Sequence, residues 1–437
     1  MFIEDVVYKI WEPITTEYEV LYQKAMKLTD EELFQKIITN LKDIDNFILN
    51  TRELNMTRLL TTGCPHNCKN GKFGGCSMCD YLSYHLDMLT LVCALRDRNP
   101  ELYAKAMRFS FDNVRGKNAK AGAVELITGH DCLNTSEIPE EAFQELFGKD
   151  DLFRRKPFKA IFETRLDSIT YKGLKKWEEK MGKKVLVEVG IEVWDEWVRN
   201  HWINKNITQS KMLEGIDIIK KAGCEVSANI LIGIPGLTED TSVKLFIETY
   251  LKLYEIGVDF ILCSPLSRKE KTLQGYIYQN MRENERLKAL SLVNGEETGM
   301  PSIFTVMDAI HQVLEIKPES IHHMTLSPAN FPVYASILGD IYKENEPMKE
   351  CVSQIMKSIQ KLSMDKDIES FAEARKTVTK TECYQEYLIF KKKQNEIGDV
   401  YQEYLVLGEE LAKNLWPLEW KRKIEDFKHE MDSYIVC

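Results

Sequence analysis

The chain lacks any long apolar run and any excess of positive charge. No stretch approaches the ~20 consecutive apolar residues that a membrane-spanning helix needs. The start, Met1-Phe-Ile-Glu-Asp-Val, has no basic region followed by an apolar one. Lys and Arg number 58 against 68 Asp and Glu, which gives a net charge of −10. These absences predict a cytoplasmic protein with no membrane partner, and they argue against a broad, non-specific polyanion binder.

The sequence also has no internal repeats and no low-complexity tracts, and its number of cysteines is odd. Eleven cysteines without a secretion signal do not fit a disulfide framework. Four of them, at positions 64, 68, 76 and 79, fall within 16 residues, and the other seven are scattered. A cluster of this kind in a cytosolic chain indicates metal or redox chemistry.

The length of 437 residues corresponds to about three domains, or to one large barrel with extensions. Residues 1–57 are acidic and helical in pattern, and Thr29 with Glu32 forms a capping box before an apolar series. Residues 331–437 are again helical in pattern. We therefore expect an N-terminal helical extension (1–57), a central region (58–330) and a C-terminal helical region (331–437).

The central region alternates short apolar runs with helical stretches. Because β-then-α units spaced ~30 residues apart imply right-handed crossovers, the pattern predicts an α/β fold. We expect a partial or full (β/α) barrel of parallel strands. Glycines 223 and 257 mark the ends of helices before the next strands. The expected strands are 58–62, 123–128, 159–163, 185–193, 225–232, 259–263 and 320–326, and the expected helices are 84–108, 137–147, 170–181, 209–222 and 240–256, with a long polar connection at 265–318.

The four clustered cysteines follow the first expected strand, at the carboxyl end where α/β folds place their active sites. Two cysteines separated by two or three intervening residues can place both sulfurs on one side of a short turn. Glycines 71, 74 and 75 let the backbone wrap closely around a bulky centre. Four readings compete: a zinc site of four thiolates, a four-cysteine iron–sulfur cluster, a three-cysteine cluster with one open iron, and four buried structural thiols.

The order Cys64-Pro, eleven residues to Cys76, then Cys79 resembles the radical SAM superfamily. It is closest to the branch that contains the elongator-type radical domain and the enzymes that complete archaeosine in tRNA. The resemblance implies that Cys64, Cys76 and Cys79 hold a [4Fe–4S] cluster whose fourth iron binds S-adenosylmethionine. It places Met78 near the adenine and leaves Cys68 spare. The triad of Cys68, Cys76 and Cys79 stays open as an alternative.

Further segments resemble the family's motifs in the same order along the chain. The resemblance implies that the predicted cofactor residues bind the amino group, ribose, carboxylate and adenine of S-adenosylmethionine. Gly129 matches the loop that holds the amino group, although the family's acid is displaced or absent there. A strand-end ion pair for Glu163 and Arg165, and a simple turn at Gly233, are the structural alternatives. These cofactor residues are Gly129, Glu163, Arg165, Glu192, Lys205, Asn229 and Gly233.

We expect an adenosyl-radical enzyme that abstracts hydrogen from a small polar metabolite or biosynthetic intermediate. Modification of a tRNA nucleoside, with the RNA brought by a partner subunit, is the second hypothesis, and a zinc-stabilised scaffold is the third. An electron-donor protein such as flavodoxin or ferredoxin is an expected partner. Other candidates for substrate contacts, proton transfer or a thiol are Arg268, Lys269, Lys271, His322, His323 and Cys263.

Overall fold

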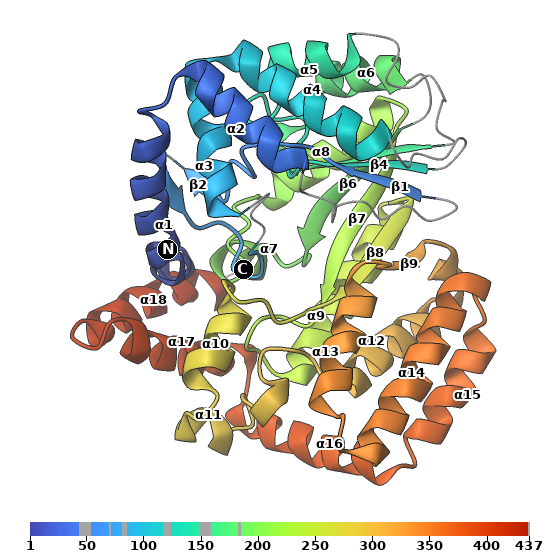
Figure 1. Ribbon diagram of the computed structural model, residues 1–437. Helices are drawn as coiled ribbons and strands as arrows, with labels where there is room; N and C mark the ends of the chain where they lie inside the picture. Colours follow the sequence, from blue (N-terminus) through green and yellow to red (C-terminus); the bar gives the residue numbers. More distant parts are fainter. Residues whose placement is uncertain are drawn as a thin grey trace.

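The computed structural model describes residues 1–42, 54–69, 71–80, 85–116, 124–148, 159–181 and 185–435. Its centre is a seven-stranded sheet in the order β1-β4-β5-β6-β7-β8-β9, and every neighbouring pair of strands is parallel (Figure 1). The α/β prediction is confirmed. The strands are β1 (Leu54–Arg58), β4 (Val124–Thr128), β5 (Ala160–Thr164), β6 (Val185–Glu192), β7 (Glu225–Ile232), β8 (Phe260–Pro265) and β9 (Met324–Leu326).

Among the described residues, β1 pairs only with β4 and β9 only with β8. The sheet is therefore open, and of the two expected forms the partial barrel is the one observed. Helices follow the strands and cover the outer face of the sheet (Figure 1). These helices are α3 (Leu86–Arg98), α4 (Pro100–Gly116), α5 (Glu140–Phe147), α6 (Tyr171–Met181), α7 (Glu196–His201), α8 (Gln209–Lys221), α9 (Glu239–Glu255) and α12 (Ile303–Ile316).

The two faces of the sheet differ in chemistry because side chains alternate along a strand. In β7, Val226, Ala228 and Ile230 belong to the hydrophobic core formed with the covering helices. The alternate positions hold Ser227 and Asn229. The apolar face therefore anchors the helices, and the opposite face carries polar groups.

Local signals in the sequence explain several element ends. The capping box is present: Glu32 N donates to Thr29 Oγ1 (3.2 Å) and Thr29 N donates to Glu32 Oε2 (2.7 Å). Gly223 and Gly257 adopt φ values of +80° and +71° directly before β7 and β8, as expected for residues that end helices. The helix expected over 84–108 is two helices, because Pro100 begins α4 and Asn99 leaves the helical conformation.

Two strands are misplaced in the prediction, and one connection differs in structure. The first strand lies at Leu54–Arg58 rather than 58–62. The last strand is confined to Met324–Leu326, and its expected beginning is the short helix η3 (Pro318–His322). The polar connection 265–318 is largely helical. It holds α10 (Leu273–Met281), α11 (Glu285–Ala289), η2 (Gly295–Glu297) and α12.

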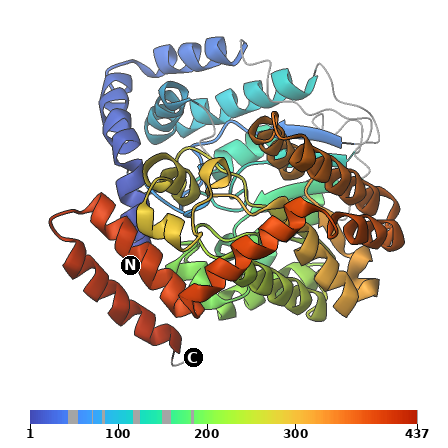
Figure 2. The same cartoon turned by 90° about the horizontal axis from the view of Figure 1, so that it is seen from below.

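The terminal helices pack on the central sheet and on each other. Figure 2 shows α1 beside α17 and α18. Phe2 stacks on Phe427 at 4.3 Å between ring centroids. Tyr384 and Tyr387 pack against Phe304 of α12, so this part of the C-terminal region contacts the helices that cover the sheet. The remaining helices are α1 (Phe2–Ala25), α2 (Asp30–Lys42), α13 (Asn330–Ile341), α14 (Glu346–Asp365), α15 (Ile368–Val378), α16 (Glu382–Gln394), η4 (Asn395–Ile397), α17 (Val400–Leu415) and α18 (Trp420–Ile435).

The expected division at 57/58 and 330/331 stays a prediction. Within the described ranges, no helix combines the length and the apolar character that crossing a bilayer requires.

Candidate active site

The cysteine loop, residues 64–79, follows β1 at the carboxyl end of the sheet. Cys68 N donates to Cys64 O (3.2 Å) and Cys79 N donates to Cys76 O (3.1 Å), so each pair of cysteines closes a short turn. Between them lies a small hairpin of β2 (Cys68–Lys69) and β3 (Lys72–Phe73). All four thiols are half-buried and unpaired by disulfides.

The loop glycines approach other parts of the chain. A Cβ on Gly74 would lie 2.4 Å from the Tyr8 ring of α1. Gly75 adopts φ +97°, and a Cβ there would lie 2.9 Å from Asn67 Cα. These glycines thus allow the loop to pack tightly on α1 and on itself, and their wrapping around a bulky centre stays a prediction.

A second set of bonds ties the loop to the segment after α7. Ser77 N donates to Ile203 O (2.8 Å) and Ser77 Oγ to Trp202 O (2.8 Å). Asn204 Nδ2 donates to Gly75 O (2.6 Å), and His66 Nε2 to Asn204 O (2.7 Å). These bonds fix Cys76 and Cys79 relative to the end of β6.

Cys64 and Cys76 share one charged neighbour. Burial raises the pKa of the Cys64 thiol to about 12, while the Arg165 guanidinium opposes this rise. Burial would lower the pKa of Arg165, yet Cys76, Asp167 and Cys64 raise it overall. The two thiols and the guanidinium therefore form one electrostatic group at the ends of β1 and β5.

Cys68 has different surroundings. Burial raises its pKa to about 11, and the charges that act on it come from Arg96 and Asp97 of α3. Tyr18 of α1 also interacts with Cys68. In this loop Cys68 faces the α1–α3 side, whereas Cys64 and Cys76 face Arg165.

Glu192 and Lys205, both expected to contact the cofactor, form a buried ion pair. Lys205 Nζ lies 2.8 Å from Glu192 Oε1, and the side chains are 9% and 6% exposed. Gly190 makes room for them, because a Cβ there would lie 2.4 Å from both charged atoms. Arg165 Nη2 donates to Lys205 O (2.8 Å). Three predicted residues thus meet beside the cysteine loop.

The loop after β4 places Gly129 against a carboxylate that the sequence reasoning missed. Glu137 is fully buried. Its Oε1 accepts from His130 N (2.9 Å) and its Oε2 from Asp131 N (2.7 Å). A Cβ on Gly129 would lie 3.3 Å from Glu137 Oε1. A buried carboxylate from eight residues downstream thus lies behind this loop, a separation that no local motif signals.

Asp131 is a second buried acid that the sequence reasoning did not assign. Its carboxylate accepts from Thr164 Oγ1 (2.7 Å), Arg165 N (3.0 Å) and Ser168 Oγ (2.6 Å). Burial raises its pKa, and these hydrogen bonds oppose the rise. Asp131 thereby fixes the backbone from which Arg165 reaches the thiols.

Two predicted residues, Glu163 and Asn229, lie on the polar face of the sheet. Glu163 pairs in register with Glu188 of β6. Asn229 Nδ2 donates to Glu188 Oε1 (2.8 Å), and burial raises the pKa of Glu188. The Asn229 Oδ1 atom is buried without a hydrogen-bond partner. Glu188 was missed because it stands within an otherwise apolar strand.

Met78 and Gly233 occupy different surroundings. Met78 is half-buried against the hydrophobic cluster that includes α10, α17 and α18. Gly233 adopts φ +103° after β7 and packs against Pro301. It also lines a cavity that contains none of the cysteine loop. The cofactor roles of both residues stay predictions.

The remaining candidates are mostly structural. His322 and His323 precede β9, so they lie at its amino end, whereas the cysteine loop lies at the carboxyl end of the sheet. His323 Nδ1 is 3.0 Å from Val258 O. Cys263 is fully buried, and burial raises its pKa well above the usual range.

The cations of the connection after β8 have partners of their own. Arg268 Nη1 donates to Glu296 O (2.7 Å), and its guanidinium lies over the Tyr278 ring. Lys269 Nζ is 3.8 Å from Asp80 Oδ1 and Lys271 Nζ is 3.8 Å from Glu270 Oε2. Their substrate contacts stay predictions.

The described residues include no group of three or more His, Cys, Asp and Glu side chains arranged to hold a single metal ion. In a tetrahedral zinc site, Zn–S bonds of ~2.3 Å hold the sulfurs within ~4 Å of one another. The cysteines of the described residues are not arranged in this way.

No family model matches the chain. An uncharacterised protein of Methanocaldococcus jannaschii is 23% identical over 270 residues, which cover 60% of this chain and 65% of that relative. The match thus spans less than two thirds of the relative's length.

Similar solved structures include archaeal Elp3 of Methanocaldococcus infernus, with TM-score 0.36, 13% identity and coverage of 53% of this chain and 52% of that one. Methylornithine synthase gives TM-score 0.39 at 13% identity, covering 70% and 78%. Coproporphyrinogen III oxidase of Escherichia coli, a radical SAM enzyme, gives TM-score 0.38 at 13% identity, covering 67% and 57%. At TM-scores below 0.5 these likenesses carry no argument about function.

Proposed function

We propose that the protein is a radical SAM enzyme in which Cys64, Cys76 and Cys79 hold a [4Fe–4S] cluster at the carboxyl end of the sheet. The observation that carries the proposal is the partition of the thiols. Cys64 and Cys76 act on Arg165, and Cys76 also acts on Lys205. Cys68 instead interacts with Tyr18 of α1 and with Arg96 and Asp97 of α3.

The donor set fits such a cluster. Thiolates are the usual ligands of iron–sulfur clusters, and the three sulfurs come from two short turns that the bonds of Ser77 and Asn204 hold in place. Two buried cations, Arg165 and Lys205, offset the negative charge of thiolates in a site shielded from water. A [4Fe–4S] cluster held by these thiols would supply one-electron reductive cleavage of S-adenosylmethionine to methionine and a 5′-deoxyadenosyl radical, which would remove a hydrogen atom from the substrate.

The chain's own residues bind and orient the nucleotide. Lys205, held by Glu192, and Arg165, held by Asp167 at 3.0 Å, present positive charge to the cofactor's carboxylate. Gly129 leaves the backbone after β4 open to the amino group, with Glu137 directly behind it. Gly233 and Met78 contribute to the adenine site.

The substrate is a small polar metabolite or biosynthetic intermediate that lies against the polar face of the sheet. Glu163, Glu188 and Asn229 face it, and the unpartnered Asn229 Oδ1 accepts a hydrogen bond from it. Flavodoxin or ferredoxin delivers the electron. No contact in the described part of the chain favours modification of a tRNA nucleoside or a zinc scaffold over this function.

The cysteine assignment is tested by iron and sulfide content after anaerobic reconstitution. Wild-type protein is expected to hold about four iron and four sulfide per chain and to be brown. Cys64→Ala, Cys76→Ala and Cys79→Ala each lose the cluster, and Cys68→Ala, the matched control from the same loop, keeps it. Loss of iron in Cys68→Ala with retention in Cys64→Ala, or a colourless protein with stoichiometric zinc, contradicts the proposal.

A further inference from the structure

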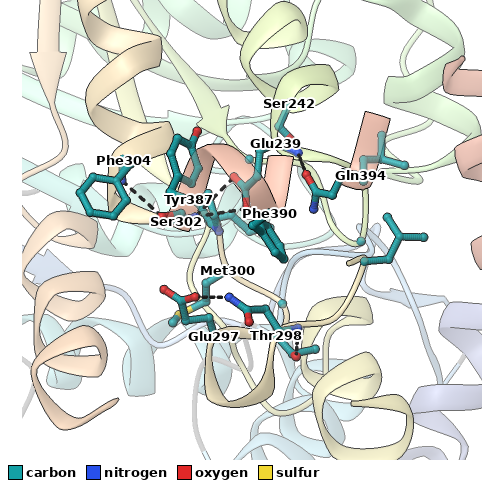
Figure 3. A pocket seen from close by; sticks show the side chains of 18 of the residues that line it. Glu239, Ser242, Glu297, Thr298, Met300, Ser302, Phe304, Tyr387, Phe390 and Gln394 are labelled. Atoms are coloured by element: carbon teal, nitrogen blue, oxygen red, sulfur yellow. Dashed lines mark hydrogen bonds between the residues drawn. The ribbon is translucent and has the colours of Figure 1, made fainter. Parts of the chain in front are cut away.

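A cavity of about 300 Å³ lies between the loop after β7, the start of α9, the segment 292–304, and helices α14 and α16 (Figure 3). None of its lining residues belongs to the cysteine loop, and Gly233 is the one predicted cofactor residue among them. Its volume is at the lower end of the range for small-molecule sites. The cavity can therefore hold a small ligand outside the cysteine site.

The ionisable lining of this cavity has one sign. Three carboxylic acids line it, Glu239, Glu297 and Glu386, and no Lys, Arg or His does. Glu239 and Glu297 come from opposite sides of the space in Figure 3. Within the described residues, none of the three acids forms an ion pair.

The two inner acids are held by neutral donors. Ser302 N donates to Glu239 Oε1 (3.3 Å) and Oε2 (3.4 Å), and the Glu239 residue is only 8% exposed. Glu297 accepts from the Tyr342 hydroxyl and from Asn294 Nδ2. Buried carboxylates in proteins are ordinarily paired with a cation, and here the protein supplies none at ion-pair distance.

Burial governs how these acids titrate. It raises the pKa of Glu239 to about 7. It raises the pKa of Glu297 to about 8, with a further rise from the charge of Glu239. Near neutral pH the pair is thus partly protonated, and a cation placed between the carboxyl groups favours loss of the protons.

The rest of the wall suits a carbon chain. Phe304, Tyr387 and Phe390 present aromatic rings, and Met300 and Met348 add flexible apolar surface. Aromatic faces attract organic cations as well as hydrocarbon. In the described ranges no three His, Cys, Asp or Glu side chains are arranged to hold a metal ion, so an organic cation fits this wall better than a metal ion.

We propose that this cavity binds a small organic ammonium ion, with its N–H groups donating to Glu239 and Glu297 and its carbon chain against Met300 and Phe390. The inference stands on the cavity alone and does not depend on the proposed cluster chemistry. Cluster-free, full-length protein is therefore the sample for its test.

Isothermal titration calorimetry with n-butylamine at pH 8.5 tests the proposal directly. Butylamine is expected to bind, while 1-butanol and butyrate, which match it in size but not in charge, are not. Glu297→Gln is expected to weaken binding at least about tenfold, since it removes one charged acceptor. Glu296→Gln is the matched control on the same short helix. Glu296 is exposed and faces Arg282, so its change leaves the affinity unaltered.

The pH profile provides a second readout. Affinity is expected to rise from pH 6 to pH 8.5 as Glu239 and Glu297 lose protons, because butylamine, like lysine with a pKa of ~10.4, stays charged over this range. Lys391 forms an ion pair with Asp240, and burial raises the pKa values of Tyr334 and Tyr387 above their usual range. The groups that face the pair are Asp240, Tyr334, Tyr342, Cys383, Glu386, Tyr387 and Lys391.

Should Glu297→Gln fail to fold, Glu386→Lys replaces it. Glu386 is exposed at the rim, so the change leaves the fold intact and places a competing cation at the cavity. Weaker butylamine binding in that variant supports the proposal. Equal binding of butanol or butyrate, unchanged affinity in Glu297→Gln or Glu386→Lys, or no binding of butylamine at 10 mM overturns it.

Discussion

At the scale of single residues, the site depends on charges that are buried together. Lys205 and Glu192 are both less than a tenth exposed. Burial lowers the pKa of Lys205, and Glu192 and Cys76 more than reverse this. Glu192 adopts φ +66° at the irregularity in the β6–β7 register, a left-handed conformation that costs a non-glycine residue about 1 kcal/mol or more. The chain accepts this strain where it positions a charge.

Glu192→Gln is expected to lower the free energy of unfolding by about 3 kcal/mol or more, because it leaves the Lys205 ammonium buried without its counter-charge. Urea denaturation measures the loss. Asp217→Asn, which breaks the exposed pair with Lys221 (side chains 55% and 70% exposed), is the control and costs less than about 1 kcal/mol. A similar loss of unfolding free energy in both variants would show that the buried pair contributes no more to stability than the exposed pair.

The sequence predicted which residues lie near this site, but it did not predict which side chains they contact. Glu163, Arg165, Glu192 and Lys205 could be selected because their segments resemble the family's motifs in the same order along the chain. Their partners could not. Glu137 reaches the β4 loop from the residues before α5, and that contact exists only after the loop has folded back.

At the scale of elements, the cysteine loop is shaped by contacts rather than by regular structure. Phe73 N donates to Thr15 Oγ1 of α1 (3.1 Å), and Gly75 lies directly against Asn67. The geometry of the three proposed ligand thiols therefore depends on helix α1 and on one left-handed glycine.

Gly75→Ala is expected to reduce cluster loading severely while the protein remains folded, because the new methyl group collides with backbone 2.9 Å away. Iron content and far-ultraviolet circular dichroism together measure the effect. Gly295→Ala is the matched control: Gly295 also has a positive φ, +48°, but nothing lies within 4 Å of its Cβ position. Full iron content in Gly75→Ala would contradict this role of the glycine.

Element positions were predictable where periodicity and end signals agree. The expected strand 225–232 matches β7, because its apolar run begins just after a helix-ending glycine. The first strand was misplaced since Leu59 and Leu60, which follow β1, are fully buried and look like strand residues. The expected helix 84–108 runs through Asn99-Pro100, although a proline disfavours the helical conformation of the residue before it.

At the scale of the whole molecule, the two ends of the chain close one side of the site. Phe2 packs between Phe427 and Trp416, Phe2 N donates to Glu430 Oε2 (2.9 Å), and Gly408 leaves room for the Phe427 ring. No sequence pattern announces this contact, because it joins segments more than 400 residues apart.

Phe427→Ala is expected to lower the free energy of unfolding by about 4 kcal/mol, as is typical for the loss of a fully buried aromatic ring. It should also expose α1 to limited proteolysis. Leu418→Ala, at a side chain that is 98% exposed, is the control and changes stability by less than about 0.5 kcal/mol. Equal protease resistance of the wild type and Phe427→Ala would show that the terminal helices pack independently.

The central claim is that three sulfurs leave one iron open for S-adenosylmethionine. The most direct test is electron paramagnetic resonance of the anaerobically reduced protein, recorded with and without S-adenosylmethionine. We predict a [4Fe–4S] signal whose g values shift when S-adenosylmethionine is added, in the wild type and in Cys68→Ala alike. A signal that does not respond to S-adenosylmethionine in the wild type, although the cluster is fully loaded and reduced, would contradict the account.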